Sequence, residues 1–178
     1  VLVTFHPETN SSISIIKQID ILTHSLKFFK NLYFIITYNN MDSGGLYFIN
    51  KLKALNKKYQ NFLLLKSLGS NLYYEFIENV DLVMGNSSSG IIEVPSSKTP
   101  TLDIGTRQLG RVKSKSIYSC ELKKISIINS IKKILNKKIK NSKNVYYQKN
   151  TKEKILKLLL KISKNKNHEV KKFIDLNF

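Results

Sequence analysis

Short apolar runs alternate along the chain with longer segments in which apolar residues recur every three or four positions. The short runs are typical of buried β-strands, and the longer segments are typical of amphipathic helices. The predicted strands are residues 1–5, 31–38, 62–65, 81–84, 101–104 and 116–119. The predicted helices are residues 11–30, 72–80, 87–93, 125–136 and 151–163, with one more that opens at Gly44 and Gly45. Mostly apolar strands that alternate with helices predict an α/β fold with a parallel sheet.

Two of these helices carry a well-defined apolar stripe. Ser11 and Ser12 are expected to cap the first helix, because a serine hydroxyl can accept hydrogen bonds from the first free amides. The inward residues of this helix are expected to be Ile15, Ile19, Leu22, Leu26 and Phe29. The helix that opens at Gly44 is expected to bury Leu46, Ile49, Leu52 and Leu55.

The length of 178 residues fits one domain. Within it, residues 1–120 are expected to form the core sheet and the ligand loops, and residues 121–178 to form Lys-rich helices. The chain begins without Met, inside a predicted strand, which suggests a fragment or a split gene. The apolar runs are too short to span a bilayer, and the N-terminus lacks the features of a signal peptide. Neither membrane insertion nor secretion is therefore expected.

Cys120 is the single cysteine of the chain, so no intrachain disulfide can form. No cluster of Cys and His has the spacing of metal ligands. We therefore expect no metal, no other cofactor and a cytoplasmic location.

The formal net charge of +18 raises the question of a nucleic-acid partner. Of the 30 basic residues, all but two are Lys, and they gather in the last third of the chain with few aromatic residues between them to stack on bases. This pattern favours a solvated basic face, so nucleic acid is not the expected partner.

The strongest ligand motif follows the fourth predicted strand, where residues 85–93 read Gly-Asn-Ser-Ser-Ser-Gly-Ile-Ile-Glu. Free amides and the dipole at a helix N-terminus attract anions, and the hydroxyls of Ser87 and Ser88 add donors. A pyrophosphate fits this arrangement. Glu93 lies in an otherwise apolar stretch, and its carboxylate could accept hydrogen bonds from the two hydroxyls of a ribose.

Both arginines of the chain, Arg107 and Arg111, follow the fifth predicted strand. An arginine presents a planar fork of donors that lysine cannot replace at a phosphate, so their shared position indicates an anion site. Other candidates follow the remaining strands, where ligands of open α/β sheets bind. They are His6, the Asn39-Asn40 turn, and the backbone around Leu68.

Three segments together resemble the UDP-N-acetylglucosamine 2-epimerases. They are Val-Thr-Phe-His-Pro-Glu-Thr at residues 3–9, the motif at residues 85–95, and Gly-Thr-Arg-Gln-Leu-Gly-Arg at residues 105–111. Their order and spacing resemble the second, C-terminal domain of this family. The Gly-Asn-Ser-Ser and Gly-Thr-Arg-Gln forms resemble the hydrolysing branch of sialic acid synthesis, since the other branch has Asp-Ser-Gly-Gly and Thr-Glu-Arg-Pro there.

The resemblance implies a Rossmann-like domain that forms the second half of a GT-B-like two-domain fold, with UDP in the cleft. It implies that Ser87 and Ser88 bind the pyrophosphate and that Glu93 binds the ribose. The other UDP-binding residues that it implies are His6, Asn40, Leu68 and Arg107. His6 also lies near the departing UDP, which makes it the one candidate catalytic residue. Asn40 could be replaced in this role by its neighbour Asn39.

The implied reaction removes the proton at sugar C2, expels UDP from C1, and adds water to the resulting 2-acetamidoglycal, giving N-acetylmannosamine. The acid–base carboxylates are expected in a missing N-terminal domain, so this chain alone is expected to be inactive. The resemblance also implies that the chain could associate with further copies of itself. The sugar could be N-acetylglucosamine or a 2,4-diacetamido-trideoxyhexose. Three alternatives stay open: half of a GT-B glycosyltransferase, a noncatalytic basic binding module, and a degenerate remnant.

Overall fold

The computed structural model describes residues 1–38, 44–97, 99–137 and 142–164. The chain divides into two units, Val1–Val145 and Tyr146–Phe178. The first unit holds the sheet and every candidate ligand loop of the sequence analysis that the structure describes.

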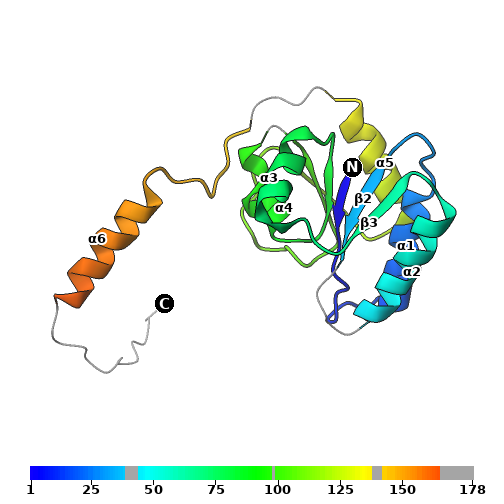
Figure 1. Cartoon of the computed structure of the whole chain (residues 1–178), viewed down its shortest axis with the longest axis horizontal. Helices are drawn as coiled ribbons and strands as arrows, with labels where there is room; N and C mark the ends of the chain where they lie inside the picture. Colours follow the sequence, from blue (N-terminus) through cyan, green and yellow to red (C-terminus); the bar gives the residue numbers. More distant parts are fainter. Residues whose placement is uncertain (39–43, 98, 138–141, 165–178) are drawn as a thin grey trace, which may run out of the picture. The chain divides into compact units, whose positions relative to one another are not determined.

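A six-stranded sheet, parallel throughout, forms the centre of the first unit (Figure 1). Its strand order is β3-β2-β1-β4-β5-β6. The strands are β1 (Leu2–Thr4), β2 (Phe34–Thr37), β3 (Phe62–Leu65), β4 (Val83–Gly85), β5 (Thr101–Ile104) and β6 (Ile117–Cys120). The expected parallel α/β sheet is confirmed.

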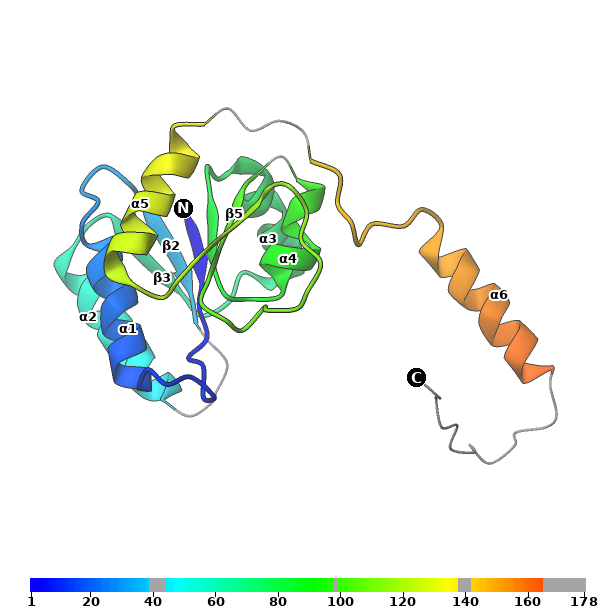
Figure 2. The same ribbon diagram turned by 180° about the vertical axis from the view of Figure 1, so that it is seen from behind.

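Helices cover both faces of this sheet, as Figures 1 and 2 show from opposite sides. One layer contains α1 (Ile15–Leu26), α2 (Gly45–Lys58) and α5 (Lys124–Leu135). The other contains α3 (Gly69–Asn79) and α4 (Ser89–Ile92), with the 3-10 turn η1 (Val94–Ser96) after α4. A sheet covered on both faces needs strands that are apolar on both sides, which is why the strands read as continuous apolar runs.

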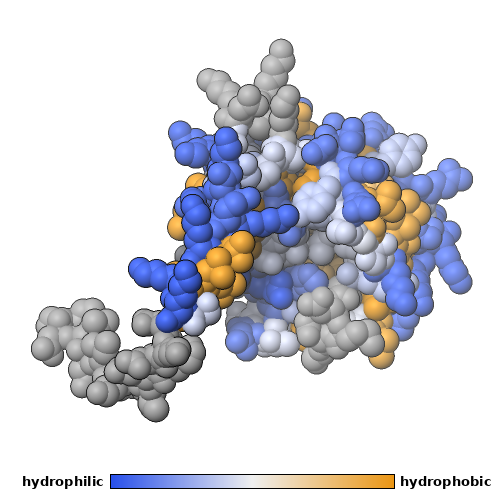
Figure 3. Space-filling model, turned by 60° about the vertical axis from the view of Figure 1, so that its left-hand side comes forward, coloured by the Kyte–Doolittle hydropathy of each residue, from blue (hydrophilic) through white to orange (hydrophobic). Residues whose placement is uncertain are grey.

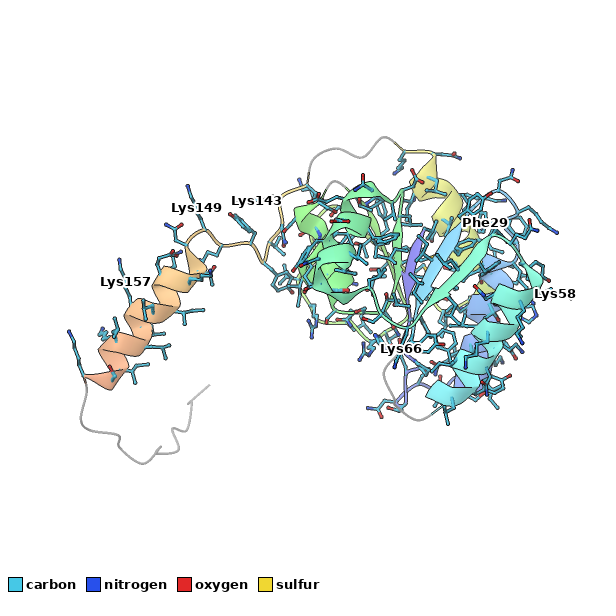
Figure 4. All side chains as sticks on the ribbon, viewed as in Figure 1. Phe29, Lys58, Lys66, Lys143, Lys149 and Lys157 are labelled. Atoms are coloured by element: carbon cyan, nitrogen blue, oxygen red, sulfur yellow. The ribbon has the colours of Figure 1, made fainter. Side chains whose placement is uncertain are left out.

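The first strand shows how the core divides between the two layers. Leu2 and Val3 are both fully buried but belong to different clusters, because successive side chains of a strand point to opposite faces. Val3 belongs to the larger cluster, in which the rings of Phe34 and Phe62 stack at 5.3 Å. Phe29, labelled in Figure 4, packs against this cluster, with its ring 6.5 Å from that of Phe34. Leu2 belongs to a smaller cluster that includes Leu68.

The first two helices depart from the expected pattern. The hydroxyl of Ser14, not of Ser11 or Ser12, caps α1 by accepting from the amide of Lys17 (3.4 Å), and the helix ends at Leu26 rather than near residue 30. Ser11 instead accepts from the amide of Ile13 within the preceding loop (3.1 Å).

In α2, the prediction that Leu46 is buried is wrong, because its side chain is 72% exposed. Phe48 is fully buried in its place and contacts Phe5 edge-on at 6.2 Å. The other inward residues predicted for this helix, Ile49, Leu52 and Leu55, are buried.

The strand order places a topological switch between β1 and β4. The chain leaves β1 toward β2 and β3 on one side, and returns through β4, β5 and β6 on the other. Ligands of open α/β sheets bind outside the carboxyl ends of the strands at such a point. The two strands approach closely there: a Cβ on Gly85, whose φ is +137°, would lie 1.8 Å from the carbonyl oxygen of Thr4. Glycine is therefore required at the end of β4.

The second unit contains α6 (Thr151–Ser163), whose bounds match the predicted helix. None of its residues is buried within the described part of the chain. Lys149 and Lys157 extend outward from the backbone in Figure 4. Among the described residues, no helix combines the length and apolar character that crossing a bilayer requires. On the face shown in Figure 3, hydrophilic residues, in blue, are spread widely between separate hydrophobic patches.

Candidate functional site

The loops after β1, β4 and β5 meet at the carboxyl edge of the sheet, the lower edge in Figure 1. They carry His6, Ser87 with Ser88, and Arg107, so the structure brings these three predicted elements together. Asn86, which precedes Ser87, is bonded both to His6 and to Arg107. The predicted Asn40 and its alternative Asn39 lie outside the described residues.

Asn86 joins the two strands at the switch point. The main-chain N–H of His6 donates to Oδ1 of Asn86 (2.7 Å), and Nδ2 of Asn86 donates to the carbonyl oxygen of His6 (2.7 Å). The Asn86 side chain is buried at 1% exposure, and His6 is 7% exposed. A buried amide in which both groups are paired fixes the backbone on each side of it.

The three amides that follow Asn86 have no hydrogen-bond partner among the described residues. They belong to Ser87, Ser88 and Ser89, which are half-buried, while the amide of Gly90 bonds to the carbonyl of Ser87 (3.2 Å). Consecutive free amides form a concave donor surface for an anion. The helix α4 contains four residues, so its dipole adds less than the sequence suggested, and the free amides are the main attraction.

The hydroxyls of this segment connect to α3. The Tyr73 hydroxyl donates to Oγ of Ser89 (2.8 Å), which in turn donates to Oγ of Ser87 (3.1 Å). Burial raises the pKa of Tyr73 to about 12, and the nearby carboxylate of Glu93 acts in the same direction. Tyr73 is therefore a neutral donor at ordinary pH and orients the Ser89 and Ser87 hydroxyls.

Glu93 and Leu68 lie on the α3/α4 side of the site. Glu93 follows the last residue of α4 and is half-exposed, although the predicted helix over residues 87–93 included it. Leu68 immediately precedes α3, and its side chain is 9% exposed and packs in the smaller core cluster. The side chain of Leu68 is thus structural, which leaves its backbone as the group that could face a base.

The loop after β5 is fastened to the same asparagine. Nη1 of Arg107 donates to the carbonyl oxygen of Asn86 (3.3 Å), and Nε2 of Gln108 donates to the same oxygen (2.8 Å). Gln108 is 3% exposed, whereas Arg107 is exposed. The guanidinium of Arg107 is therefore held beside the start of the Ser87–Ser89 amides. Arg111 is also exposed, and its side chain has no such bond among the described residues.

Glu8 links the loop after β1 to the loop after β5. Its carboxylate accepts from the amides of Thr106 and Arg107 (3.2 Å each) and from the Thr106 hydroxyl (2.8 Å). The main chain of Glu8 is held in turn by Gln18, which is fully buried: Oε1 of Gln18 accepts from the Glu8 amide and Nε2 donates to the Glu8 carbonyl (2.8 Å each).

A cavity of about 720 Å³ opens beside Glu8, between the loops that follow β1, β5 and β6. Ile13, Leu109 and Leu122 give it an apolar lining, and Glu121 and Lys123 are the other charged residues of its wall. Cys120 also lines it, and burial raises the pKa of this thiol to about 11. Among the described residues, no group of three or more His, Cys, Asp and Glu side chains could hold a metal ion.

Sequence reasoning missed four residues that build the site. Asn86 and Glu8 stood inside recognised motifs but were given no role, and Gln18 and Tyr73 were not considered. Gln18 carried a signal, because a glutamine on the apolar stripe of an amphipathic helix needs a buried partner. Tyr73 carried no comparable signal, since adjacent tyrosines on a helix are ordinary.

Comparison with known proteins identifies the family. The family model described as UDP-N-acetylglucosamine 2-epimerase matches residues 1–160. The chain is 37% identical over 180 residues to the polysialic acid biosynthesis protein P7 of Escherichia coli, covering 98% of this chain and 46% of that protein. It is 37% identical over 123 residues to the hydrolysing GDP/UDP-N,N'-diacetylbacillosamine 2-epimerase of Campylobacter jejuni, covering 68% of this chain and 32% of that protein.

Solved structures share the fold. MnaA of S. aureus, determined with UDP, aligns with a TM-score of 0.69 at 12% identity, covering 97% of this chain and 47% of that chain. The chain thus spans about half the length of the proteins that it matches. The parallel Rossmann-like sheet, the three motifs at its carboxyl edge and the family match over residues 1–160 agree, and the chain belongs to the UDP-N-acetylglucosamine 2-epimerase family.

Proposed function

We propose that this chain binds the UDP portion of a UDP-linked N-acetylhexosamine and serves a hydrolysing 2-epimerase. The observation that carries the proposal is the run of unpartnered amides at Ser87–Ser89, with the guanidinium of Arg107 held beside it at the switch point. Amides and one arginine together provide neutral and charged donors of the kind that a diphosphate accepts.

Each remaining residue has a distinct role in this proposal. Ser87 and Ser88 bind the pyrophosphate through their amides and hydroxyls, and Glu93 accepts the ribose hydroxyls. The backbone at Leu68 contacts the uracil. His6 lies next to the diphosphate at the end of β1, where it would stabilise the departing UDP. Asn40 or Asn39 completes the nucleotide site.

The chemistry divides between this chain and the part of its relatives that it does not span. When the bond between C1 and the UDP oxygen breaks, its electron pair goes to UDP, and the proton at C2 goes to a base. The donors of this chain stabilise the charge on the departing diphosphate, which lowers the barrier to elimination. The carboxylates that move protons at the sugar would come from the unspanned part. Water then adds to the 2-acetamidoglycal and gives N-acetylmannosamine.

Titration of the chain with UDP by calorimetry tests the nucleotide site. Arg107→Lys should weaken binding by roughly 10- to 100-fold, because one charge-assisted hydrogen bond is worth about 1.5–3 kcal/mol. Glu93→Ala should weaken it through the loss of the ribose contact. Arg111→Lys is the matched control, since Arg111 makes no bond to Asn86, and it should change UDP affinity less than Arg107→Lys does.

The outcome that contradicts the nucleotide site is an absence of saturable UDP binding. Tight nucleic-acid binding that falls steeply with salt would then favour the basic binding module. A separate assay with UDP-N-acetylglucosamine and with a UDP-2,4-diacetamido-trideoxyhexose tests the division of chemistry. Turnover of either compound by this chain alone would show that the acid–base groups lie within it.

A further inference from the structure

The carboxylate of Glu8 spans two loops that are almost 100 residues apart in the sequence. Oε1 accepts from the amides of Thr106 and Arg107, and Oε2 accepts from the Thr106 hydroxyl. The separations along the chain are 98 and 99 residues. Nδ2 of Asn86 also donates a longer bond to Oε1 (3.4 Å). The Glu8 carboxylate therefore holds the loop that carries Arg107 and also contacts Asn86.

The surroundings of Glu8 hold the carboxylate in this place. Gln18, on α1, clamps its main chain from both sides through the amide and the carbonyl. Gly105 offers no side chain against it: a Cβ there would lie 2.6 Å from Oε1 of Glu8, and its φ of +84° already disfavours a side chain. The backbone on each side is thus shaped around the carboxylate.

A negative charge beside a diphosphate site needs an explanation. Like charges repel, so a carboxylate with no structural task would weaken the binding of UDP. At Glu8 the charge is met by two amides and a hydroxyl, which belong to the loop that presents the guanidinium, and by Nδ2 of Asn86. The loop therefore keeps the conformation in which Nη1 of Arg107 reaches the carbonyl of Asn86.

We propose that Glu8 is a positioning residue of the nucleotide site. It fixes the backbone of Thr106 and Arg107, and the fixed backbone directs the guanidinium toward the diphosphate. This inference rests on the proposed UDP-binding function. Glu8 acts through Arg107 and has no contact of its own with the nucleotide.

The first test is a double-mutant cycle for UDP affinity by calorimetry, with Glu8→Ala, Arg107→Ala and the double variant. If Glu8 acts through Arg107, Glu8→Ala should weaken binding by roughly 10-fold in the wild-type background and by less than about twofold in the Arg107→Ala background, because coupled sites are non-additive. Equal effects in both backgrounds would overturn the proposal.

Glu8→Gln separates positioning from charge and covers the case in which Glu8→Ala does not fold. The glutamine keeps an oxygen that accepts from the two amides, so UDP affinity should stay within about threefold of wild type, less than the cost of one lost charge-assisted bond. An affinity as low as that expected for Glu8→Ala would overturn the positioning role. Glu78→Gln, at an exposed position near the end of α3, is the matched control for the same substitution and should leave binding unchanged.

A measurement without nucleotide distinguishes failure of this proposal from failure of the proposed function. Amide hydrogen exchange, followed by NMR, should become faster at Thr106 and Arg107 in Glu8→Ala, since their acceptor is lost. If wild type binds no UDP, the proposed function fails. The amide exchange rates in wild type and Glu8→Ala then still test whether Glu8 orders the loop after β5. Unchanged exchange at both amides would overturn the role of Glu8 in either case.

Discussion

The side chain of Asn86 and the main chain of His6 exchange two hydrogen bonds of 2.7 Å each, although the residues are 80 positions apart. The carbonyl oxygen of the same asparagine receives Arg107 and Gln108. One buried residue thus sets the relative positions of the loops after β1, β4 and β5. The geometry of the candidate site therefore depends on this amide.

Replacing Asn86 with alanine should lower the free energy of unfolding by about 2–4 kcal/mol, because it removes two hydrogen bonds to the buried main chain of His6. Urea denaturation followed by circular dichroism measures the loss. Asn129→Ala, at an exposed position of α5, is the control and should change the unfolding free energy by less than about 0.5 kcal/mol. A change at Asn86 as small as the control would show that the reciprocal pair contributes little.

The ion pair between Lys113 and Asp103 fastens the far end of the loop after β5 to the sheet. Nζ of Lys113 lies 2.7 Å from Oδ2 of Asp103, whose side chain is 3% exposed, and it also donates to Oγ of Ser119 (2.7 Å). Lys113→Met should cost about 2–4 kcal/mol of unfolding free energy, because it leaves a buried charge unpaired.

Adding Asp103→Asn to Lys113→Met should recover much of that loss, since the double variant no longer buries a lone charge. Lys115→Met, at an exposed neighbouring position, serves as the control in the same denaturation series. Asp103→Asn alone completes the cycle. If its effect and that of Lys113→Met add up to the effect of the double variant, the pair is not coupled.

Tyr73 should make the stability of the domain depend on pH in the alkaline range. Its folded pKa is raised from 10.0 to about 12 by burial, so its contribution is complete below pH 10 and is lost as the pH rises toward 12. The unfolding free energy should fall by up to about 2 kcal/mol over this interval. Tyr73→Phe should lack that component, and Tyr74→Phe, at a residue that is 51% exposed, should retain it. Identical pH profiles for wild type and Tyr73→Phe would contradict the prediction.

The thiol of Cys120 should react slowly with Ellman's reagent in the native protein at pH 8. Burial raises its pKa from 9.0 to about 11, which reduces the reactive thiolate by roughly 100-fold relative to an unperturbed thiol. The rate should increase up to about pH 11 and should be fast in denaturant at pH 8. Cys120 is the single cysteine, so Cys120→Ser gives the background rate. Native reactivity equal to that in denaturant would show that the thiol is not shielded.

The elements with continuous apolar runs were the most predictable from the sequence. The bounds of β3, β5 and α6 are those predicted. The errors fall where several local signals compete: three serines precede α1, and Ser14 rather than Ser11 or Ser12 is the cap. Leu46 fits a helical stripe but lies in the first turn of α2, where Phe48 meets Phe5 and takes the core position.

The residue types of the candidate site could be read from the sequence, but the connections between them could not. Serines, a glutamate and the two arginines at strand ends indicate a nucleotide without any knowledge of the strand order. The bonds of Asn86 to His6, and of Glu8 to Thr106 and Arg107, join segments 80 to 99 residues apart. Such contacts depend on the reversal between β1 and β4, and no local pattern in the sequence determines that order.

The central place of β1 in the sheet has a consequence for synthesis and folding. Of the six strands, β1 is made first, yet its neighbour β4 and the asparagine that pairs with His6 follow 80 residues later. Contacts between distant segments form slowly, because the entropy of closing a long loop must be overcome before they are made. A nascent chain can pair β1 with β2 and β3 early, but the loops after β1, β4 and β5 can meet only after Arg107 has emerged and the two halves of the sheet have joined.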